Sequence, residues 1–280
     1  MFTQLKLLLY LQSIRSPLLT YIFLTFTMSI ETPVVILFSS ILYWTVDKVF
    51  GMELLFNLST NITLNSGLKD LIRFPRPIGS KNLTSLHLPT ATGYSFPSGH
   101  TQIATTFWES MMLHFKHSYM YIIGTIFIIC IGFSRIYLGV HWPTDVIGAI
   151  VTGTMCTLLC HKAFNYILNT KKNSILIYIY IPFLIICFIL KDGSYIKVAG
   201  LYGGLILGYI LESKFVKFST KVPLKDKIMR GLLGILSLFL FYLALDYTFP
   251  SYLILIYLKY FATCCFAIAF VPYMFTIFHI

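Results

Sequence analysis

The feature that most constrains this chain is a succession of long apolar runs separated by short polar breaks. A helix that crosses a bilayer needs about 20 predominantly apolar residues, and the sequence holds several stretches of that kind. Hydrophobic residues make up 57% of the 280 residues and charged residues only 11%, whereas about a quarter of the residues in a soluble domain are charged. We therefore expect an all-α, polytopic transmembrane helix bundle.

Turn signals divide the apolar runs into about ten helical segments. A polar stretch at residues 73–97, rich in proline and glycine, cannot span and is interpreted as a loop. The first ten residues are expected to lie along the membrane surface. The pattern predicts a six-helix core within residues 1–170 and a C-terminal transmembrane extension over residues 171–280. The predicted helices cover residues 17–30, 33–46, 51–71, 98–115, 119–133, 143–164, 174–190, 195–211, 228–245 and 252–277.

The formal net charge of +11 fits a membrane protein better than a nucleic-acid-binding protein. Basic residues cluster between apolar runs, as the positive-inside rule expects, and a mostly embedded chain has little surface for nucleic acid. With a cytoplasmic N-terminus, Lys6, Arg15 and the segment 214–230 lie on the cytoplasmic side. The loop 73–97 then faces outward.

Polar chemistry is concentrated in three short segments, at residues 69–77, 97–100 and 134–145. On the predicted topology all three emerge on the same face of the membrane. Charged residues at helix ends commonly anchor a span at the interface, and that reading would suffice for one segment alone. Three converging segments that carry two histidines indicate a functional site instead.

The residue types in these segments suit a phosphate group. Lys69, Arg76 and Arg135 supply positive charge, and a guanidinium binds phosphate oxygens through two parallel hydrogen bonds. Ser98 and Gly99 open a helix, where backbone N–H groups point toward an anion and glycine permits close approach. These five residues are the predicted phosphate-binding set.

Two histidines and a carboxylate complete the predicted site. Asp145 follows His141 by four residues, about one turn if Pro143 begins a helix. The carboxylate is expected to fix the imidazole tautomer and leave the other nitrogen free to attack phosphorus. His100 stands in a different segment and is the candidate acid for the leaving oxygen. In contrast, Glu31 either contacts the substrate or, as we favour, is a helix-end carboxylate exposed to water, and His87 is interpreted as an interfacial residue.

Three motifs stand in order along the chain: Lys69-x6-Arg76-Pro77, Pro97-Ser98-Gly99-His100 and Ser134-Arg135-x5-His141-x3-Asp145. They resemble the three signatures of the phosphatidic-acid phosphatase type 2 superfamily. That superfamily includes lipid phosphate phosphatases and the vanadium haloperoxidases. The resemblance covers roughly residues 17–164 and implies a phosphohistidine mechanism without metal or cofactor. It implies His141 as nucleophile, Asp145 as its orienting partner and His100 as general acid. The chain looks most like bacterial members with a C-terminal extension, which implies a bacterial cytoplasmic membrane and an extracytoplasmic site.

The expected partner is a lipid phosphate or diphosphate, such as undecaprenyl diphosphate, phosphatidate, phosphatidylglycerol phosphate or a sphingoid-base phosphate. Transfer of phosphate to a second alcohol is the nearest alternative, and a non-catalytic transporter or scramblase is a more distant one. Gly200, Gly204 and Gly208 recur every fourth residue, a spacing that lets helices approach closely in lipid. This face either packs internally, which we favour, or forms a dimer.

Overall fold

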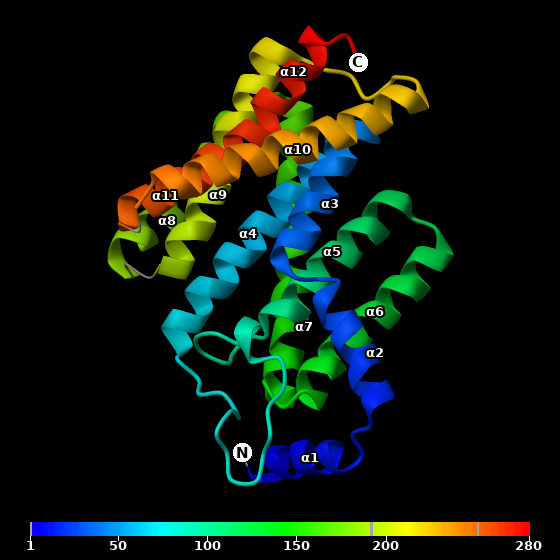
Figure 1. Ribbon diagram of the computed structural model, residues 1–280, viewed down its shortest axis with the longest axis vertical. Coiled ribbons are helices and arrows are strands. Elements are labelled where there is room, and N and C mark those ends of the chain that lie inside the picture. Colours follow the sequence, from blue (N-terminus) through cyan, green and yellow to red (C-terminus); the bar gives the residue numbers. More distant parts are fainter. Residues whose placement is uncertain (1, 191–192, 251) are drawn as a thin grey trace. The chain divides into compact units, whose positions relative to one another are not determined.

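The computed structural model describes residues 2–190, 193–250 and 252–280, and within these ranges the regular structure is entirely helical (Figure 1). The all-α transmembrane class expected from the sequence is therefore confirmed. The helices are α1 (Phe2–Ser13), α2 (Pro17–Met28), α3 (Thr32–Thr45), α4 (Lys48–Ile72), α5 (Gly99–Phe115), α6 (Ser118–Tyr137), α7 (Pro143–Thr170), α8 (Ser174–Leu190), α9 (Gly193–Leu211), α10 (Leu224–Thr248), α11 (Leu253–Cys265) and α12 (Val271–Ile277).

Short polar motifs start several of these helices where the sequence changes from polar to apolar. Ser16 accepts a hydrogen bond from the Leu19 N–H and precedes a proline, the usual arrangement at a helix N-terminus. Asp47 accepts bonds from two backbone N–H groups at 2.9 Å and so caps α4. The last predicted span, 252–277, is divided by a π-helical turn at Phe266–Phe270.

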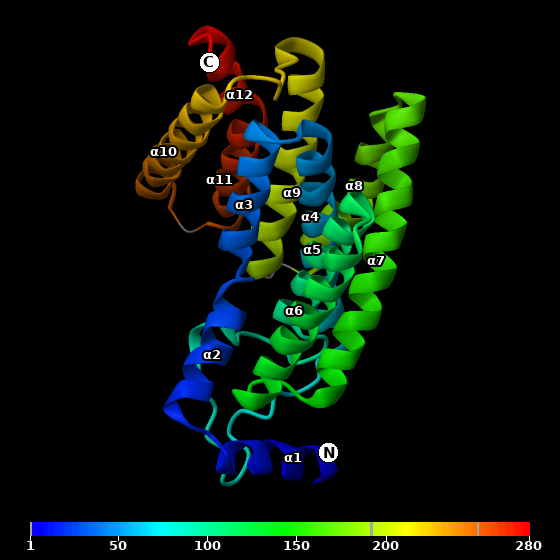
Figure 2. The ribbon, with the colours of Figure 1, turned by 90° about the vertical axis from the view of Figure 1, so that its right-hand side faces the viewer.

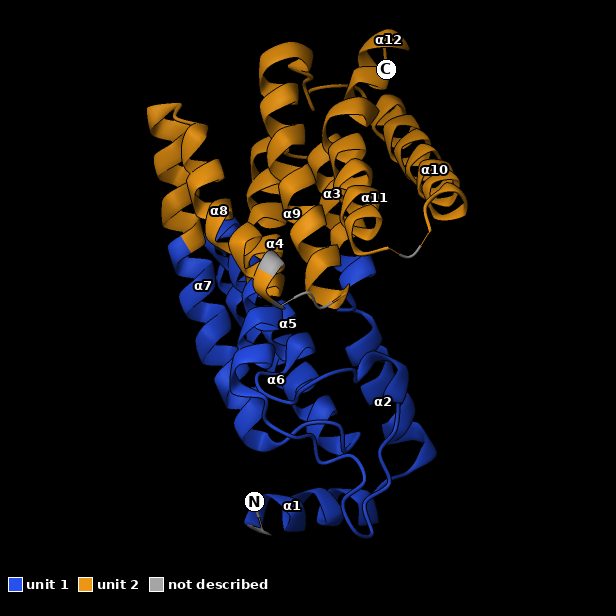
Figure 3. Cartoon of the chain, turned by 90° about the vertical axis from the view of Figure 1, so that its left-hand side faces the viewer, with its two compact units in different colours: residues 1–35, 64–159 blue, residues 36–63, 160–280 orange. Residues whose placement is uncertain are grey.

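The chain divides into two compact units, shown in Figure 3. Unit 1 comprises residues 1–35 and 64–159, and unit 2 comprises residues 36–63 and 160–280. Helices α3, α4 and α7 contribute residues to both units. All the predicted site residues belong to unit 1. The predicted division near residue 170 stays a prediction.

In the described residues, five helical segments are long and apolar enough to cross a membrane: α6, α7, α10, residues 193–216 (α9 with the π-helical turn Glu212–Val216) and the interrupted helix 253–277. Helix α2 has only 12 residues, a length of about 18 Å, whereas the hydrocarbon layer is about 30 Å thick. Helices α2 and α3 pass the same test only when they are taken together as one broken span.

The predicted position of the N-terminal residues relative to the loop 73–97 is wrong. Helix α1 lies beside this loop (Figure 2), where Gln12 donates to the Asn82 carbonyl at 3.0 Å and Arg15 donates to the Thr84 carbonyl at 2.7 Å. Arg15 also donates to the Tyr137 carbonyl at 2.6 Å, just before the third motif's turn. The sequence reading counted two crossings, whereas the short helices α2 and α3 are long and apolar enough for a span only when they are taken together.

The glycine face of α9 packs within unit 2, as we favoured. A Cβ placed on Gly204 would overlap the Phe261 carbonyl oxygen, and one on Gly200 would lie 2.6 Å from the Tyr257 carbonyl oxygen. Both neighbours belong to α11, which therefore occupies this face. The glycines thus serve internal packing in this structure, and the oligomeric state of the protein stays a prediction.

Candidate active site

His141 lies in a short turn between the end of α6 and the start of α7. Gly139 shapes this turn with a φ of +71°, a left-handed conformation that L side chains rarely adopt. Pro143 then starts α7, and Asp145 sits in its first turn, where its Oδ2 accepts the Trp142 N–H at 2.8 Å. The helix start thus holds the carboxylate one turn from His141.

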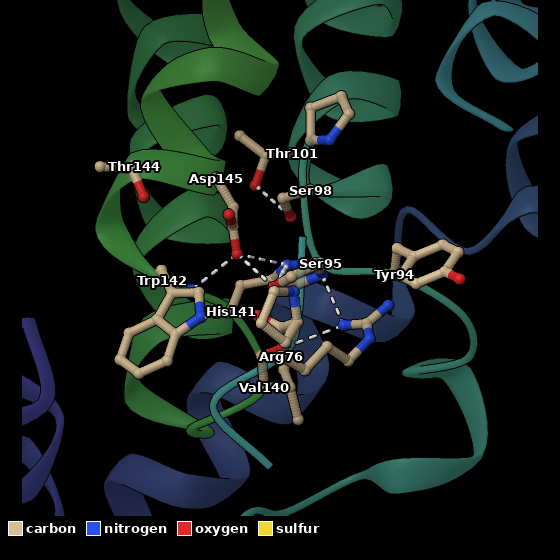
Figure 4. Close-up of polar contacts among 12 residues, drawn as sticks. Arg76, Tyr94, Ser95, Ser98, Thr101, Val140, His141, Trp142, Thr144 and Asp145 are labelled. Atoms are coloured by element: carbon tan, nitrogen blue, oxygen red, sulfur yellow. Dashed lines mark hydrogen bonds and ion pairs between the residues drawn. The ribbon is translucent and has the colours of Figure 1, made fainter. Parts of the chain in front are cut away.

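The hydrogen bonds of His141 define its tautomer. Its Nδ1 lies 3.2 Å from Asp145 Oδ2, and its Nε2 lies 3.0 Å from Arg76 Nη1 (Figure 4). Because a guanidinium can only donate, Nε2 must accept and Nδ1 must carry the proton toward the carboxylate. His141 is almost completely buried. The nitrogen with the free electron pair is therefore Nε2, on the side away from Asp145.

Burial and surrounding cations keep this imidazole neutral. Loss of hydration lowers the pKa of His141 well below its usual value, and the positive charges of Arg76, Lys69 and Arg135 lower it further. His100 acts in the same direction. These four predicted residues thus lie within electrostatic range of His141.

Arg76 connects the loop 73–97 to the His141 turn. Its Nε and Nη2 donate to the carbonyls of Gly93 and Thr92 at 2.9 and 2.7 Å, and its Nη1 donates to the Val140 carbonyl at 2.9 Å. Burial lowers the pKa of Arg76 to about 10, which leaves the group charged at neutral pH. Lys69, at the end of α4, donates to the Tyr94 carbonyl at 2.7 Å. Two cations therefore fix the loop's shape.

Ser95 is a site residue that the sequence analysis missed. Its hydroxyl donates to Asp145 Oδ2 at 2.5 Å and lies 3.4 Å from His141 Nδ1. Its backbone N–H donates to the Phe74 carbonyl at 2.7 Å, which joins the two ends of the loop. Ser95 stands two residues before the Pro97 motif, but no spacing rule connects it to Asp145.

Arg135 and His100 carry buried nitrogen atoms that have no hydrogen-bond partner in the described structure. Arg135 is fully buried; its Nη1 donates to Thr27 Oγ1 at 2.6 Å, while its Nε and Nη2 have no acceptor. The Nε2 of His100 is likewise buried without a partner. Buried donors without acceptors are costly. An anion that enters the site would satisfy them.

The predicted Ser98–Gly99 helix start is present, but Ser98 uses its polar groups differently. Its hydroxyl accepts a bond from Thr101 Oγ1 at 3.0 Å and makes no bond to a helix N–H. Its backbone N–H donates to the Asp145 carbonyl at 3.1 Å, which ties α5 to α7. Asn65 supports the same turn by donating to the Pro97 carbonyl at 3.2 Å.

Of the predicted set, Arg76, His141 and Asp145 form one continuous hydrogen-bonded chain with Ser95 (Figure 4). Glu31 and His87, which we expected to face water separately, form a pair instead. No three His, Cys, Asp or Glu side chains in the described ranges lie together as a metal site requires. The absence of a metal and a cofactor from the reaction stays a prediction.

The structure thus combines apolar helices long enough to cross a membrane with a buried histidine that lies among positively charged side chains. Residues 50–169 match the family model described as "PAP2 superfamily". The chain belongs to the PAP2 superfamily, the family that its motifs resemble. Residues 196–280 further match "PAP2 superfamily phosphatase, transmembrane extension", which covers most of the region that we predicted as a C-terminal extension.

Named relatives are similar to parts of this chain. An undecaprenyl-diphosphatase of Sulfolobus acidocaldarius is 34% identical over 112 residues, 40% of this chain and 54% of the relative. Phosphatidylglycerophosphatase B of Bacillus subtilis is 33% identical over 118 residues, 39% of this chain and 55% of the relative. The chain thus spans about half the length of each. The crystal structure of Aquifex aeolicus LpxE is 27% identical with a TM-score of 0.51, over 57% of this chain and 95% of that one.

Proposed function

We propose that this protein hydrolyses a lipid phosphate or diphosphate through a phosphohistidine at His141. The observation that carries the proposal is the hydrogen-bonded orientation of the His141 ring. Asp145 accepts the Nδ1 proton, so the electron pair of Nε2 is directed toward the cations and away from the carboxylate. A neutral, oriented imidazole beside positive charge is what attack on a phosphoryl group requires.

The reaction follows from this arrangement. Nε2 attacks the terminal phosphorus, and the bond to the leaving oxygen breaks, which is the lipid ester oxygen in a monophosphate and the bridging oxygen in a diphosphate; His100 supplies the proton that this oxygen needs. Water then attacks the phosphohistidine and releases inorganic phosphate. Arg76 now donates to Nε2, so bound phosphate must take over this donor before attack. The unpartnered Nε and Nη2 of Arg135 are available for further phosphate oxygens.

A lipid substrate is supported by the surroundings of the site and by the relatives. Helices α2 and α6 pack together through Phe23, Phe133 and Tyr137 close to the motif residues. Their outer sides are apolar and exposed, for example Tyr21 at 71% and Ile122 at 62%. In a bilayer such surfaces face hydrocarbon. The two curated relatives are named for phosphatase activity on lipids.

We further propose that the membrane is a bacterial cytoplasmic membrane and that the site faces its outer side. The positive-inside argument now rests on the basic residues of the segment 214–230 and of the turn at Lys116. Lys6 and Arg15 no longer contribute, because α1 lies on the side of the active-site loop. A cysteine in place of Lys81, an exposed residue of the same loop, is expected to react with an impermeant label in intact cells.

The decisive experiment is release of inorganic phosphate from a panel of lipid phosphates and diphosphates by the purified chain in detergent, with a chelator present. His141→Ala is expected to lower kcat by at least about 10³-fold, because the nucleophile is lost. His117→Ala, an exposed histidine at the start of α6, is the matched control and keeps full activity. Phosphate release without an added alcohol distinguishes hydrolysis from transfer. Full activity of His141→Ala contradicts the proposal.

A further inference from the structure

A carboxylate and an imidazole form a pair beside the catalytic residues without belonging to the site described above. Glu31 Oε1 lies 3.1 Å from His87 Nε2, and the two side chains are 27% and 19% exposed. Both residues belong to unit 1. The pair is therefore reachable from outside the protein but largely enclosed.

Glu31 is held at the break between α2 and α3. Its carbonyl accepts the N–H groups of Val34 and Val35 at 2.9 and 3.1 Å, so its backbone starts α3. Four residues earlier, Thr27 accepts a hydrogen bond from Arg135. The Glu31 carboxylate also interacts electrostatically with Arg135. This acidic group thus lies near the guanidinium whose remaining donors are unpartnered.

His87 is held equally firmly from the other side. The preceding Leu86 N–H donates to the Leu138 carbonyl at 2.9 Å, and the Ser85 hydroxyl donates to the Gly139 carbonyl at 2.7 Å. These acceptors lie in the turn that leads to His141. The His87 ring interacts electrostatically with His100, the proposed acid for the leaving group. The Glu31–His87 pair is therefore fixed between the break of α2 and α3 and the turn that leads to His141.

We propose that the Glu31–His87 pair lies toward the leaving group and selects lipid monophosphates over lipid diphosphates. This inference rests on the proposed function. The phosphoryl group that is transferred lies against the cations and His141, and the leaving oxygen lies toward His100. In a monophosphate, the next group beyond this oxygen is an uncharged alkyl chain. In a diphosphate, it is a second anionic phosphate, which meets the Glu31 carboxylate. A misplaced like charge is an effective way to reject a competing ligand.

The size of the effect follows from the interaction of two partly exposed charges. Two charges about one Debye length apart (~8–10 Å), at an effective dielectric constant of about 20 and with further screening by solvent, change a rate by about fivefold. Two prenyl esters with the same hydrocarbon, farnesyl phosphate and farnesyl diphosphate, isolate this effect. The measured quantity is the ratio of kcat/KM for the monophosphate to kcat/KM for the diphosphate.

The full chain in detergent is expected to prefer the monophosphate, and Glu31→Gln to lower this ratio by about fivefold. Glu109→Gln makes the same substitution on α5, where Glu109 accepts a bond from Thr154 across to α7, and leaves the ratio unchanged. His87→Asn, which suits the left-handed backbone at φ 57°, leaves the carboxylate without its imidazole and raises the ratio. This second variant tests the inference if Glu31→Gln does not fold.

The outcomes separate the two proposals. If neither ester and no member of the lipid panel is hydrolysed, the proposed function is refuted, and this inference is refuted with it. Hydrolysis of both esters with a preference for the diphosphate refutes only the inference. If Glu31→Gln changes the ratio no more than Glu109→Gln does, only the inference is refuted, because the charge of Glu31 would then have no role in selection.

Discussion

Ser95 provides the sharpest test of how His141 is oriented. Its hydroxyl is fully buried and donates to Asp145 Oδ2, the same oxygen that faces His141 Nδ1. The substitution Ser95→Ala removes one oxygen atom and leaves every cation and both histidines in place. It therefore perturbs the position of the carboxylate without touching the groups that bind phosphate or transfer protons.

The expected loss can be worked out from the remaining contacts. A hydrogen bond to a charged group contributes about 1.5–3 kcal/mol. Asp145 Oδ2 still accepts the Trp142 N–H at 2.8 Å and faces His141 Nδ1 at 3.2 Å, so the carboxylate oxygen keeps partners. The free-energy cost of Ser95→Ala is therefore expected at the lower end of this range, about 1.5 kcal/mol. If this is lost in the transition state, kcat/KM falls by about tenfold.

The assay is phosphate release by the purified variant, with the melting temperature measured in the same detergent. Ser40→Ala is the matched control, because Ser40 is also a buried serine but donates only to the Ile36 carbonyl in its own helix. A folded Ser95→Ala with wild-type kcat/KM would refute the reasoning. So would an equal loss in Ser40→Ala, since the effect would then come from removing any buried hydroxyl.

Two further predictions concern pH and packing. Because burial and cations lower the pKa of His141, the ring stays neutral as the pH falls. The acid limb of the pH profile of kcat/KM is therefore expected below about pH 6.5. An acid limb that reaches half of the maximal kcat/KM above about pH 6.5 contradicts this prediction. Gly204→Ala is expected to destabilise the protein by about 1–3 kcal/mol through overlap with Phe261, seen as a lower melting temperature. Gly231→Ala, where a Cβ meets open space, leaves that temperature unchanged or raises it.

Much of the site was predictable because its residues are close in sequence to helix ends. The spacing of His141 and Asp145 predicts their contact, since a helix that starts at Pro143 brings residues four apart together. Lys69, Arg135 and His100 stand in the end turns of α4, α6 and α5, which apolar run lengths already locate. Local periodicity and helix geometry are sufficient for these residues.

Other contacts join residues whose separation no local rule describes. Ser95 reaches Asp145 across 50 positions, and Arg135 reaches Thr27 across 108. The loop 73–97 has no periodicity, and its path depends on carbonyls that Arg76 and Lys69 bind in the folded protein. The position of α1 was mispredicted because a sequence count treats two short apolar runs as two crossings.

The sequence alone thus determined that this chain is a helical membrane protein, and it predicted which residue types would bind a phosphate group. Both follow from short-range properties, namely the apolar length that a bilayer demands and the charge that a phosphate demands. Only the tertiary structure decided that Arg76 and Asp145 hold opposite sides of the His141 ring and that Glu31 pairs with His87. Those contacts depend on how a loop packs against distant helix ends.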